Sequence, residues 1–337
     1  MSSENNSLKS FCFIIPMRNP RDDKVHNYRV LENALHLTVK SALGQTYQET
    51  YVVVVCQKVP PWSSSYSNHL KFIDVSNSSV FSPNPNTTVD KFFRWAIGSL
   101  YAIKELNPGY IMLIDADDYV HNTLASRVMN LKLPSSKDFF MIDKGLNVSL
   151  YKRSNGDLEL ERAFVVDRFD KTCGSCRVFE TYKLIATLKK INSNICNKFS
   201  EMFRIKHENI IDVSPEPIAW LDSVTTGDKR AVGSLLDTFG RHTHQERHFS
   251  YEYLNFVAAA KGCGHGNHSG HREGSVHWKC VIGRMPIQKF MADYSLIGER
   301  ACKKGLQLLL LDIRYLVFRL VNPFMNPIRR LMRRLKA

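Results

Sequence analysis

The stretch that decides the fold is Tyr110-Ile111-Met112-Leu113-Ile114-Asp115-Ala116-Asp117-Asp118, in which a short apolar run passes directly into three carboxylates. Such a run is typical of a buried strand in a parallel sheet. Ligands of such sheets bind beyond the carboxyl ends of the strands. The side chains of Asp115, Asp117 and Asp118 are therefore predicted to lie at a ligand-binding edge.

The sequence on the amino-terminal side of this stretch alternates between predicted strands and helices. The strands cover residues 11–16, 51–55 and 72–75, and the helices cover 28–43 and 89–106. We expect Gly44 to end the first helix, as glycine often does. This alternation predicts a mostly parallel sheet with helices on both faces.

The second half of the chain gives weaker patterns. We expect strands at 137–152 and 163–169 and helices at 180–206 and 229–240. Residues 242–280 are rich in His and Gly, and we expect irregular structure there. Together the two halves predict an α/β fold with a Rossmann-like nucleotide-binding half and a mixed sheet.

The chain has 337 residues, of which 44% are hydrophobic, enough for one large domain and an appendage. We assign residues 1–285 to one catalytic domain, in which 1–130 bind the nucleotide and 131–285 the acceptor. Residues 286–337 form a C-terminal helical appendage. The polar start of the chain lacks a secretory leader, and eight scattered cysteines do not make a disulfide scaffold, so we expect a cytoplasmic protein.

The net charge of +14 is concentrated at the C-terminus, where the segment from Glu299 onward contains ten basic and only two acidic residues. Apolar residues within 328–335 recur at helical spacing with arginines between them, as in a helix that lies on an anionic membrane. We therefore expect the tail to contact the inner face of a membrane peripherally. The alternative is a helix docked on the protein with a solvated basic face. The apolar run 305–321 carries internal charges and is short for a membrane span. Aromatic residues do not interleave with the arginines, so we expect no nucleic-acid partner.

Three carboxylates at one strand end are costly to hold together unless a cation neutralises them. Oxygen ligands of this kind suit Mg²⁺ or Mn²⁺. The alternative is a turn of Asp residues that caps a helix starting near His121.

Three ordered motifs resemble the nucleotide-binding half of family-2-like glycosyltransferases, which have the GT-A fold. They are the opening strand and turn Phe13–Asn19, the segment Ser41–Tyr47 with its Gln45-Thr46-Tyr47, and Ile114–Tyr119 around the acidic cluster. Together they span about a third of the chain, within residues 11–130.

The resemblance implies that Asp117, with Asp115, contacts the metal that binds the donor diphosphate, and that Asp118 shapes the site. Ala116 would also contact the donor. The turn that contains Pro16, Arg18 and Asn19 would line the nucleotide pocket. These positions are expectations from the family pattern.

The chain departs from the family after the second strand, where relatives often carry Asp-Asp-Gly-Ser and this sequence has Cys56-Gln57-Lys58. The identity of the nucleotide base is therefore open. Gln57 is a donor-binding candidate, and Asp90, Lys91 and Arg94 could contact base or phosphates from the start of the next helix. The alternative for Lys91 and Arg94 is a solvated helix face.

The C-terminal half resembles the family more loosely. Cys173-Gly174-Ser175-Cys176 falls where relatives place a small-residue loop beside donor sugar and acceptor. His268, in a Gly-x-Gly-x-Asn-His-Ser segment, is our first candidate for a further metal ligand, and His242 or His244 is the second.

An inverting transfer needs a carboxylate that takes the proton of the acceptor hydroxyl. Asp228 is our candidate, and Asp222 and Glu246 compete with it. Asp228 could instead be a helix N-cap.

Cys173 and Cys176 admit a zinc hypothesis as well. Their partners would be two of a set of distant residues: Cys263, Cys280, His242, His244 and His265. A redox dithiol lacks a thioredoxin-like context, and free, partly buried thiols are the remaining alternative.

These observations predict a metal-dependent glycosyltransferase, of the hexosyltransferase class, that moves a sugar from a nucleoside diphosphate sugar to a hydroxyl of a glycan or lipid-linked acceptor. A UDP-sugar is the first donor candidate. A nucleotidyltransferase would need a glycine-rich loop after the first strand, where this chain has Pro16–Arg21 without glycine. The remaining alternative is a non-catalytic member of the fold that serves as a binding or scaffold subunit in a membrane-associated glycan assembly.

Overall fold

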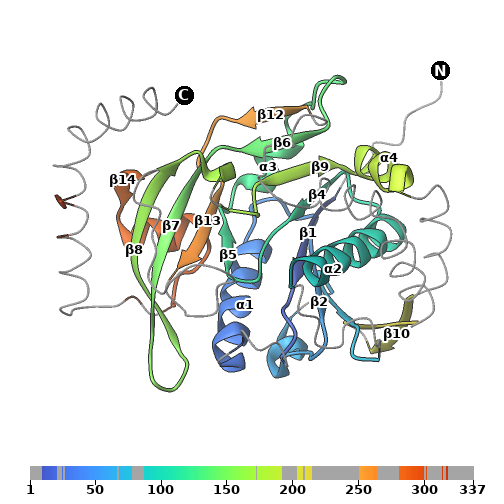
Figure 1. Ribbon diagram of the computed structural model, residues 1–337, viewed down its shortest axis with the longest axis horizontal. Helices are drawn as coiled ribbons and strands as arrows, with labels where there is room; N and C mark the ends of the chain where they lie inside the picture. Colours follow the sequence, from blue (N-terminus) through green and yellow to red (C-terminus); the bar gives the residue numbers. More distant parts are fainter. Residues whose placement is uncertain are drawn as a thin grey trace, which may run out of the picture.

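The computed structural model describes most of the N-terminal two thirds of the chain and parts of the rest (Figure 1). The described residues are 10–20, 25, 27–66, 68–77, 87–171, 173–191, 203–207, 209–214, 250–263, 281–299, 301, 313, 316 and 317.

A nine-stranded sheet forms the centre of the molecule, in the order β10-β11-β3-β2-β1-β4-β9-β6-β12. Its strands are β1 (Phe11–Pro16), β2 (Thr50–Cys56), β3 (Leu70–Asp74), β4 (Tyr110–Leu113), β6 (Phe139–Ile142), β9 (Arg177–Glu180), β10 (Phe203–His207), β11 (Ile210–Val213) and β12 (Tyr251–Leu254). The strands β11, β3, β2, β1 and β4 run parallel, whereas β9 runs antiparallel to β4 and β6. The predicted α/β fold with a parallel nucleotide half and a mixed sheet is confirmed.

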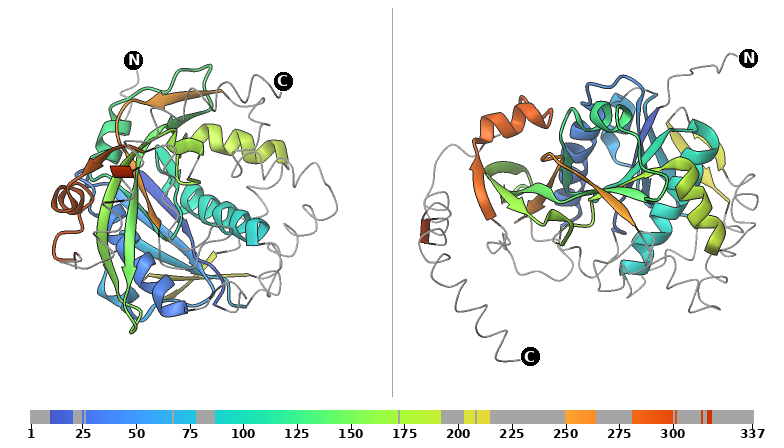
Figure 2. Two further views of the ribbon diagram at one scale, coloured as in Figure 1. Left: turned by 60° about the vertical axis from the view of Figure 1, so that its left-hand side comes forward. Right: turned by 90° about the horizontal axis from the view of Figure 1, so that it is seen from above.

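The parallel strands form because every position of β1 and most of β2 can be apolar when both faces are covered. The side chains from Phe11 to Ile15 and from Val52 to Val55 are fully buried. The helices α1 (Tyr28–Leu43) and α2 (Thr87–Tyr101) lie on opposite sides of this sheet (Figures 1 and 2). At Gly98 of α2 an added Cβ would overlap the side chain of Ile14, so a larger residue would push α2 away from β1.

A second, five-stranded sheet lies beside the first, in the order β14-β8-β7-β13-β5 (Figure 1). Its strands are β5 (Asp118–Val120), β7 (Lys144–Lys152), β8 (Leu158–Asp167), β13 (Ala259–Cys263) and β14 (Val281–Met285). One face of this sheet packs into a separate apolar cluster with α8 (Ile287–Asp293), through Leu146, Phe290 and Tyr294. The other α-helices in the described part of the chain include α3 (Leu124–Met129) and α4 (Thr181–Ile191).

The strands and helices predicted before the acidic stretch are confirmed within a few residues. The helix predicted over 89–106 is α2 followed by one π-helical turn, Ala102–Leu106. The first helix does end at Gly44, but its φ of −77° is ordinary. Glycine is required there because a Cβ would overlap the side chain of Ser295, whose hydroxyl donates to the Gly44 carbonyl at 2.7 Å.

Two predictions for the second half were wrong in part. Of the helix predicted over 180–206, residues 181–191 form α4, but residues 203–207 form the strand β10; residues 192–202 lie outside the described part of the chain. Strands β12 and β13 lie within 242–280, where we expected irregular structure, because pairing with distant β6 and β7 decides their conformation.

Residues 137–152 form two strands rather than one, β6 and β7. The predicted helix over 229–240 and the basic segment 328–335 lie outside the described residues, as does nearly all of the apolar run 305–321. Within the part of the chain that the structure describes, no helix has the length and apolar character that crossing a membrane requires.

The Gln45 side chain joins the end of α1 to the segment that follows the acidic stretch. Its amide nitrogen donates to the carbonyls of Ser41, at 3.2 Å, and His121, at 3.0 Å. Its amide oxygen accepts from the backbone N–H of Ala125 at 2.9 Å. Next to it, the backbone N–H of Thr46 donates to the carbonyl of Asn122 at 2.7 Å. The Gln-Thr pair of this motif thus anchors the chain just beyond β5.

Replacing Gln45 by leucine should destabilise the fold. The substitution removes the hydrogen bonds to Ser41, His121 and Ala125, so we expect the free energy of unfolding to fall by about 2–3 kcal/mol. Urea unfolding followed by circular dichroism measures it. Gln48→Leu, at an exposed position three residues on, is the matched control. Equal stability of the two variants would contradict an anchoring role for Gln45.

Candidate metal and nucleotide site

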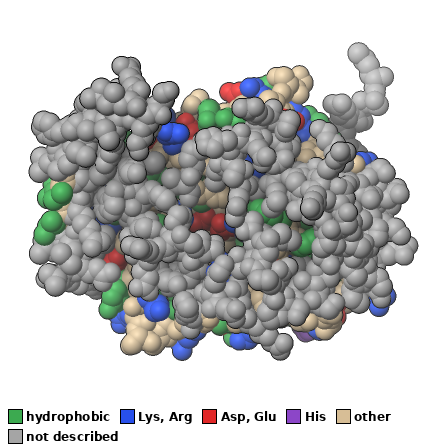
Figure 3. All heavy atoms as spheres, in the orientation of Figure 1, with side chains coloured by type: hydrophobic (Ala, Val, Ile, Leu, Met, Phe, Trp, Pro, Cys, Tyr) green, Lys and Arg blue, Asp and Glu red, His purple; other side chains and the backbone are tan. Residues whose placement is uncertain are grey.

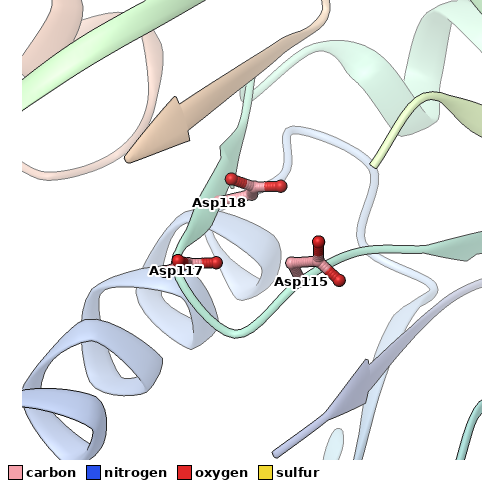
Figure 4. A group of neighbouring side chains, drawn as sticks. All are labelled: Asp115, Asp117 and Asp118. Atoms are coloured by element: carbon pink, nitrogen blue, oxygen red, sulfur yellow. The ribbon is translucent and has the colours of Figure 1, made fainter. Parts of the chain in front are cut away.

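The acidic stretch forms the tight turn between β4 and β5, so it joins the two sheets. The backbone N–H of Asp118 donates to the carbonyl of Asp115 at 3.1 Å and closes the turn. Carboxylate oxygens of Asp115, Asp117 and Asp118 lie within 4.8 Å of one another (Figure 4). Acidic side chains are visible near the middle of the face shown in Figure 3. The three carboxylates that we predicted as a cluster do come together.

The turn after β1 lies at the same edge of the large sheet. Strand β1 pairs in parallel with β4 and with β2, so the carboxyl ends of all three strands point the same way. Pro16 is the last residue of β1, and Asn19 is buried just beyond it, whereas Arg18 is half-buried. The candidates Pro16, Arg18 and Asn19 therefore lie at the edge where we predicted the nucleotide pocket.

Asp118 is buried, with only 2% of its surface exposed. One of its carboxylate oxygens accepts from the Ser175 hydroxyl at 2.5 Å and from the Cys173 thiol at 3.0 Å. The Ser175 hydroxyl oxygen also accepts from the backbone N–H of Asp115 at 2.7 Å. The loop at 173–176 thus holds both ends of the acidic turn.

Burial and the negative charges of Asp117 and Asp115 raise the pKa of Asp118 to about 8, although its two side-chain hydrogen bonds favour the charged form. A carboxyl group in this state is neutral over much of the physiological range when no cation is bound. The turn therefore disfavours a third negative charge unless a cation offsets it.

Both thiols of the 173–176 loop form hydrogen bonds to neighbouring acceptors. Burial raises the pKa of Cys173 well above its usual value, and its thiol donates to Asp118. The Cys176 thiol donates to the carbonyl of Gly174 at 3.9 Å. Among the described residues, the acidic turn is the one group with metal-ligand spacing, and Cys173, Cys176 and Cys263 form no disulfide bonds there. The other proposed zinc partners, Cys280, His242, His244 and His265, lie outside those residues.

Lys91 brings positive charge to the acidic turn. Its ammonium forms an ion pair with Asp115 and lies 4.4 Å from the centre of the Trp95 ring. A Cβ added to Gly174 would lie 3.3 Å from that ammonium, so the backbone of the loop also borders it. Lys91 therefore lies at the acidic turn and is not part of a fully solvated helix face, which was the alternative for it.

Asp90, Arg94 and Gln57 form a second network beside Lys91. Two nitrogens of the Arg94 guanidinium donate to the two carboxylate oxygens of Asp90, each at 3.0 Å. One of these nitrogens also donates to the Gln57 amide oxygen at 3.0 Å. Because Arg94 is fully buried, the alternative of a solvated helix face is wrong for it. The network fixes the start of α2 against the end of β2.

Lys261, on β13, is a site residue that the sequence did not reveal. It pairs with Asp118 across the antiparallel β13 and β5. Burial would lower its pKa, but the neighbouring Cys173, Cys263, Asp118 and Asp117 raise it overall. The adjacent Gly262 donates its N–H to the carbonyl of Asp117 at 3.1 Å, and a Cβ there would overlap that carbonyl. Only the pairing of β13 with β5 reveals this contact.

Ala116 lies half-buried within the turn and packs against the main core. The proposed catalytic base Asp228 lies outside the described residues, as do its competitors Asp222 and Glu246. The same holds for His268, our first candidate for a further metal ligand.

The donor set fits a small divalent cation. It consists of carboxylates alone, which Mg²⁺ and Mn²⁺ prefer, and two of the three carboxylates are partly exposed. Asp115 and Asp117 would hold such an ion directly. Burial, and then the charges of Asp117 and Asp115, raise the pKa of Asp118, so a bound cation would favour its charged form.

No family model and no curated protein matches this sequence. Among solved structures, TarS of S. aureus in complex with UDP-GlcNAc matches with a TM-score of 0.36 and 16% identity, over 79% of this chain and 60% of that one. Apo GlyE of Streptococcus pneumoniae TIGR4 matches at 0.28 and 13%, over 65% and 43%. A mannose-6-phosphate isomerase from Helicobacter pylori matches at 0.33 and 13%, over 63% and 88%. The chain spans 37% to 60% of the lengths of the three first-ranked TarS chains. With TM-scores this low, the function must be inferred from the residues of this chain.

The raised pKa of Asp118 predicts a pH-dependent stability of the metal-free protein. A carboxyl group has a pKa near 3.9 in the unfolded chain, so the folded protein holds this proton more tightly. The stabilisation is complete below about pH 4 and is lost as the pH rises through about 8. Asp118→Asn stays neutral, so its melting temperature should exceed that of the wild type by about 5 °C or more at pH 8.

Thermal unfolding of both proteins with a chelator, at pH 4, 6 and 8, measures this difference. We expect the gap between the two melting temperatures to close toward pH 4. Parallel pH profiles would show that Asp118 is ionised in the free protein.

The ion pair between Lys91 and Asp115 predicts competition between the lysine and the metal. Lys91→Met removes the competing cation, so Mn²⁺ should bind the nucleotide-free protein about tenfold more tightly, the equivalent of about 1.4 kcal/mol. Lys91→Arg should keep the wild-type affinity. Isothermal titration calorimetry measures it, with Lys104→Met, an exposed lysine beyond the end of α2, as the control. Unchanged or weaker Mn²⁺ binding in Lys91→Met would contradict the competition.

Proposed function

We propose that this protein is a metal-dependent glycosyltransferase that moves a hexose from a nucleoside diphosphate sugar to an acceptor hydroxyl, with inversion. The observation that carries the proposal is the convergence of Asp115, Asp117 and Asp118 at the carboxyl end of β4, the last of the parallel strands in the middle of the nine-stranded sheet. Nucleotides bind at this edge of α/β sheets. Adjacent carboxylates at such an edge suit a cation that bridges protein and phosphates.

The residues around the turn support different parts of such a reaction. Asp115 and Asp117 would hold the ion, which when bound stabilises negative charge on the leaving diphosphate. Asp118 lies buried behind them and keeps the turn in place through Ser175 and Cys173. Lys91 would leave Asp115 when the ion binds, and its ammonium would then be available to a phosphate group.

The Asp90–Arg94–Gln57 network supports the nucleotide side of the pocket indirectly. Its guanidinium is buried and held by two partners, so it fixes the position of α2 and thereby of Lys91. We propose that Gln57 and Asp90 contact the base or ribose with the polar atoms that remain accessible, and that Arg18 and Asn19 complete this side of the pocket.

We propose the sugar acceptor and the catalytic base from the sequence alone. We propose a glycan or lipid-linked acceptor near an anionic membrane surface, because the C-terminal segment from Glu299 is strongly basic. Asp228 would take the proton of the acceptor hydroxyl. A UDP-sugar is the first donor to test.

Release of nucleoside diphosphate from a panel of UDP-, GDP- and dTDP-sugars, with Mn²⁺ or Mg²⁺, tests this proposal. We expect one donor to be hydrolysed slowly, and the release to stop with a chelator. Asp117→Ala should reduce the rate by about 100-fold or more, because it removes a metal ligand. Glu105→Ala, which removes an exposed carboxylate in the π-helical turn after α2, is the control and should keep the wild-type rate.

Absence of release from every donor, together with absence of metal-dependent nucleotide binding, would contradict the proposal. The protein would then be a non-catalytic binding or scaffold subunit, and the acidic turn would be structural.

A further inference from the structure

A row of paired residues crosses the second sheet from the acidic turn to a buried amide. Lys261 on β13 pairs with Asp118 on β5 on one side and with Asn147 on β7 on the other. Directly paired residues on neighbouring strands point their side chains to the same face of a sheet. Asn147 therefore lies on the face that carries Asp118, two strand spacings or about 10 Å away.

The Asn147 side chain is fully buried, with 0% of its surface exposed. Neither its amide oxygen nor its amide nitrogen has a hydrogen-bond partner within the described part of the chain. A buried amide without partners is costly, whereas an apolar side chain at the same place would not be. The packing of the sheet thus gives no reason for an asparagine here.

Two further polar side chains continue this face. The Ser149 hydroxyl donates to one carboxylate oxygen of Glu161 at 2.6 Å. Glu161 is the extra residue of a bulge in β8 and is 0% exposed, and its other carboxylate oxygen has no partner among the residues described. We call Lys261, Asn147, Ser149 and Glu161 the polar face.

Aromatic rings border the polar face on its far side. Phe164 on β8 pairs with Asn147, and the ring of Phe169 lies so close to Gly145 that a Cβ there would overlap it. Polar groups that converge beside buried rings are typical of small-molecule sites, in which a few hydrogen bonds set the orientation of the ligand.

We propose that the polar face binds the sugar of the donor, and that the Asn147 amide hydrogen-bonds to two of its oxygens. This inference rests on the proposed function, because a diphosphate held at the acidic turn determines where the attached sugar begins. An amide offers one acceptor and one donor side by side, which matches neighbouring oxygens of a pyranose, each of which can accept and most of which can donate. The sugar would thereby give Asn147 the partners that the described part of the chain does not.

A site that hydrogen-bonds to a substrate hydroxyl discriminates strongly against analogues that lack it. Asn147 is then a specificity-determining residue, and Glu161 with Ser149 would contact the hydroxyls that lie farther from the diphosphate. The opposite face of the same strands is apolar and packs against α8, so the polar face lies on the side of the sheet away from that helix.

The test uses Asn147→Leu, which replaces the amide by apolar groups of similar shape. With metal present, calorimetry measures the affinity of the full-length protein for the sugar nucleotide and for its nucleoside diphosphate. We expect the variant to bind the sugar nucleotide about tenfold or more weakly, to bind the nucleoside diphosphate as the wild type does, and to melt no lower than the wild type. Asn147→Val, a smaller strand-forming residue, should behave in the same way if leucine disturbs the fold.

Ser99→Ala is the matched control. Ser99 is also fully buried, and its hydroxyl too lacks a partner in the described chain, but it lies in the second half of α2. We expect it to change neither affinity.

Other outcomes separate this inference from the function on which it rests. If both Asn147 variants bind sugar nucleotide and nucleoside diphosphate as the wild type does, the polar face is not the sugar site, and the proposed function stands. If the variants unfold at much lower temperature, Asn147 is a structural residue and the inference is wrong. If the wild type binds neither nucleotide with metal, the proposed function itself fails.

Discussion

The site depends on the hydrogen bonds that the buried side chain of Asp118 accepts. This carboxylate accepts hydrogen bonds from Ser175 and Cys173, and Ser175 also holds the backbone of Asp115, so one short loop fixes both ends of the acidic turn. From the other side, the N–H of Gly262 binds the carbonyl of Asp117. A turn with three carboxylates would otherwise open to separate its charges. Segments some sixty and one hundred and fifty residues downstream along the chain keep it closed, as the bonds from Ser175 and Gly262 show.

Charge compensation follows from this closed turn. Lys91 reaches it from α2 and Lys261 from β13, so two ammonium groups offset part of the charge of three carboxylates. The two lysines differ in what they can do. Lys261 is held within a sheet, between strands on both sides, whereas Lys91 is one-third exposed at the start of a helix and can move. A metal ion would therefore displace Lys91 first. Binding of the metal would then also release the Lys91 ammonium toward the phosphates.

The sequence predicts the parallel half of the fold well, because buried parallel strands are continuous apolar runs and two clear helices, α1 and α2, lie between them. It also predicts the acidic turn, since the carboxylates are adjacent in the chain. It does not predict Lys261, whose role depends on the pairing of β13 with β5.

The strand β10 was predicted as helix, although Phe203-Arg204-Ile205-Lys206 alternates between apolar and polar residues as an exposed strand does. That alternation was a usable signal. No sequence signal predicts the hydrogen bonds from the 173–176 loop to Asp118, because the position of a motif in the chain does not show which atoms come into contact.

The two faces of the second sheet show how stability and function are divided. On one face, Tyr119, Leu146 and Ala260 pack with α8 and supply the apolar burial that holds the sheet in place. On the other face, each of these strands places a polar or charged residue in the interior: Asp118 on β5, Lys261 on β13 and Asn147 on β7. Alternation of this kind normally marks a sheet with one face in water. Here Asp118 and Asn147 are almost completely buried, so water does not explain their polarity. Local rules for stable packing are commonly broken at sites that serve a ligand. The row begins at carboxylates suited to a diphosphate-bound metal and continues to an amide without partners among the described residues, so the ligand that best explains it carries its negative charge at one end and its hydroxyls at the other.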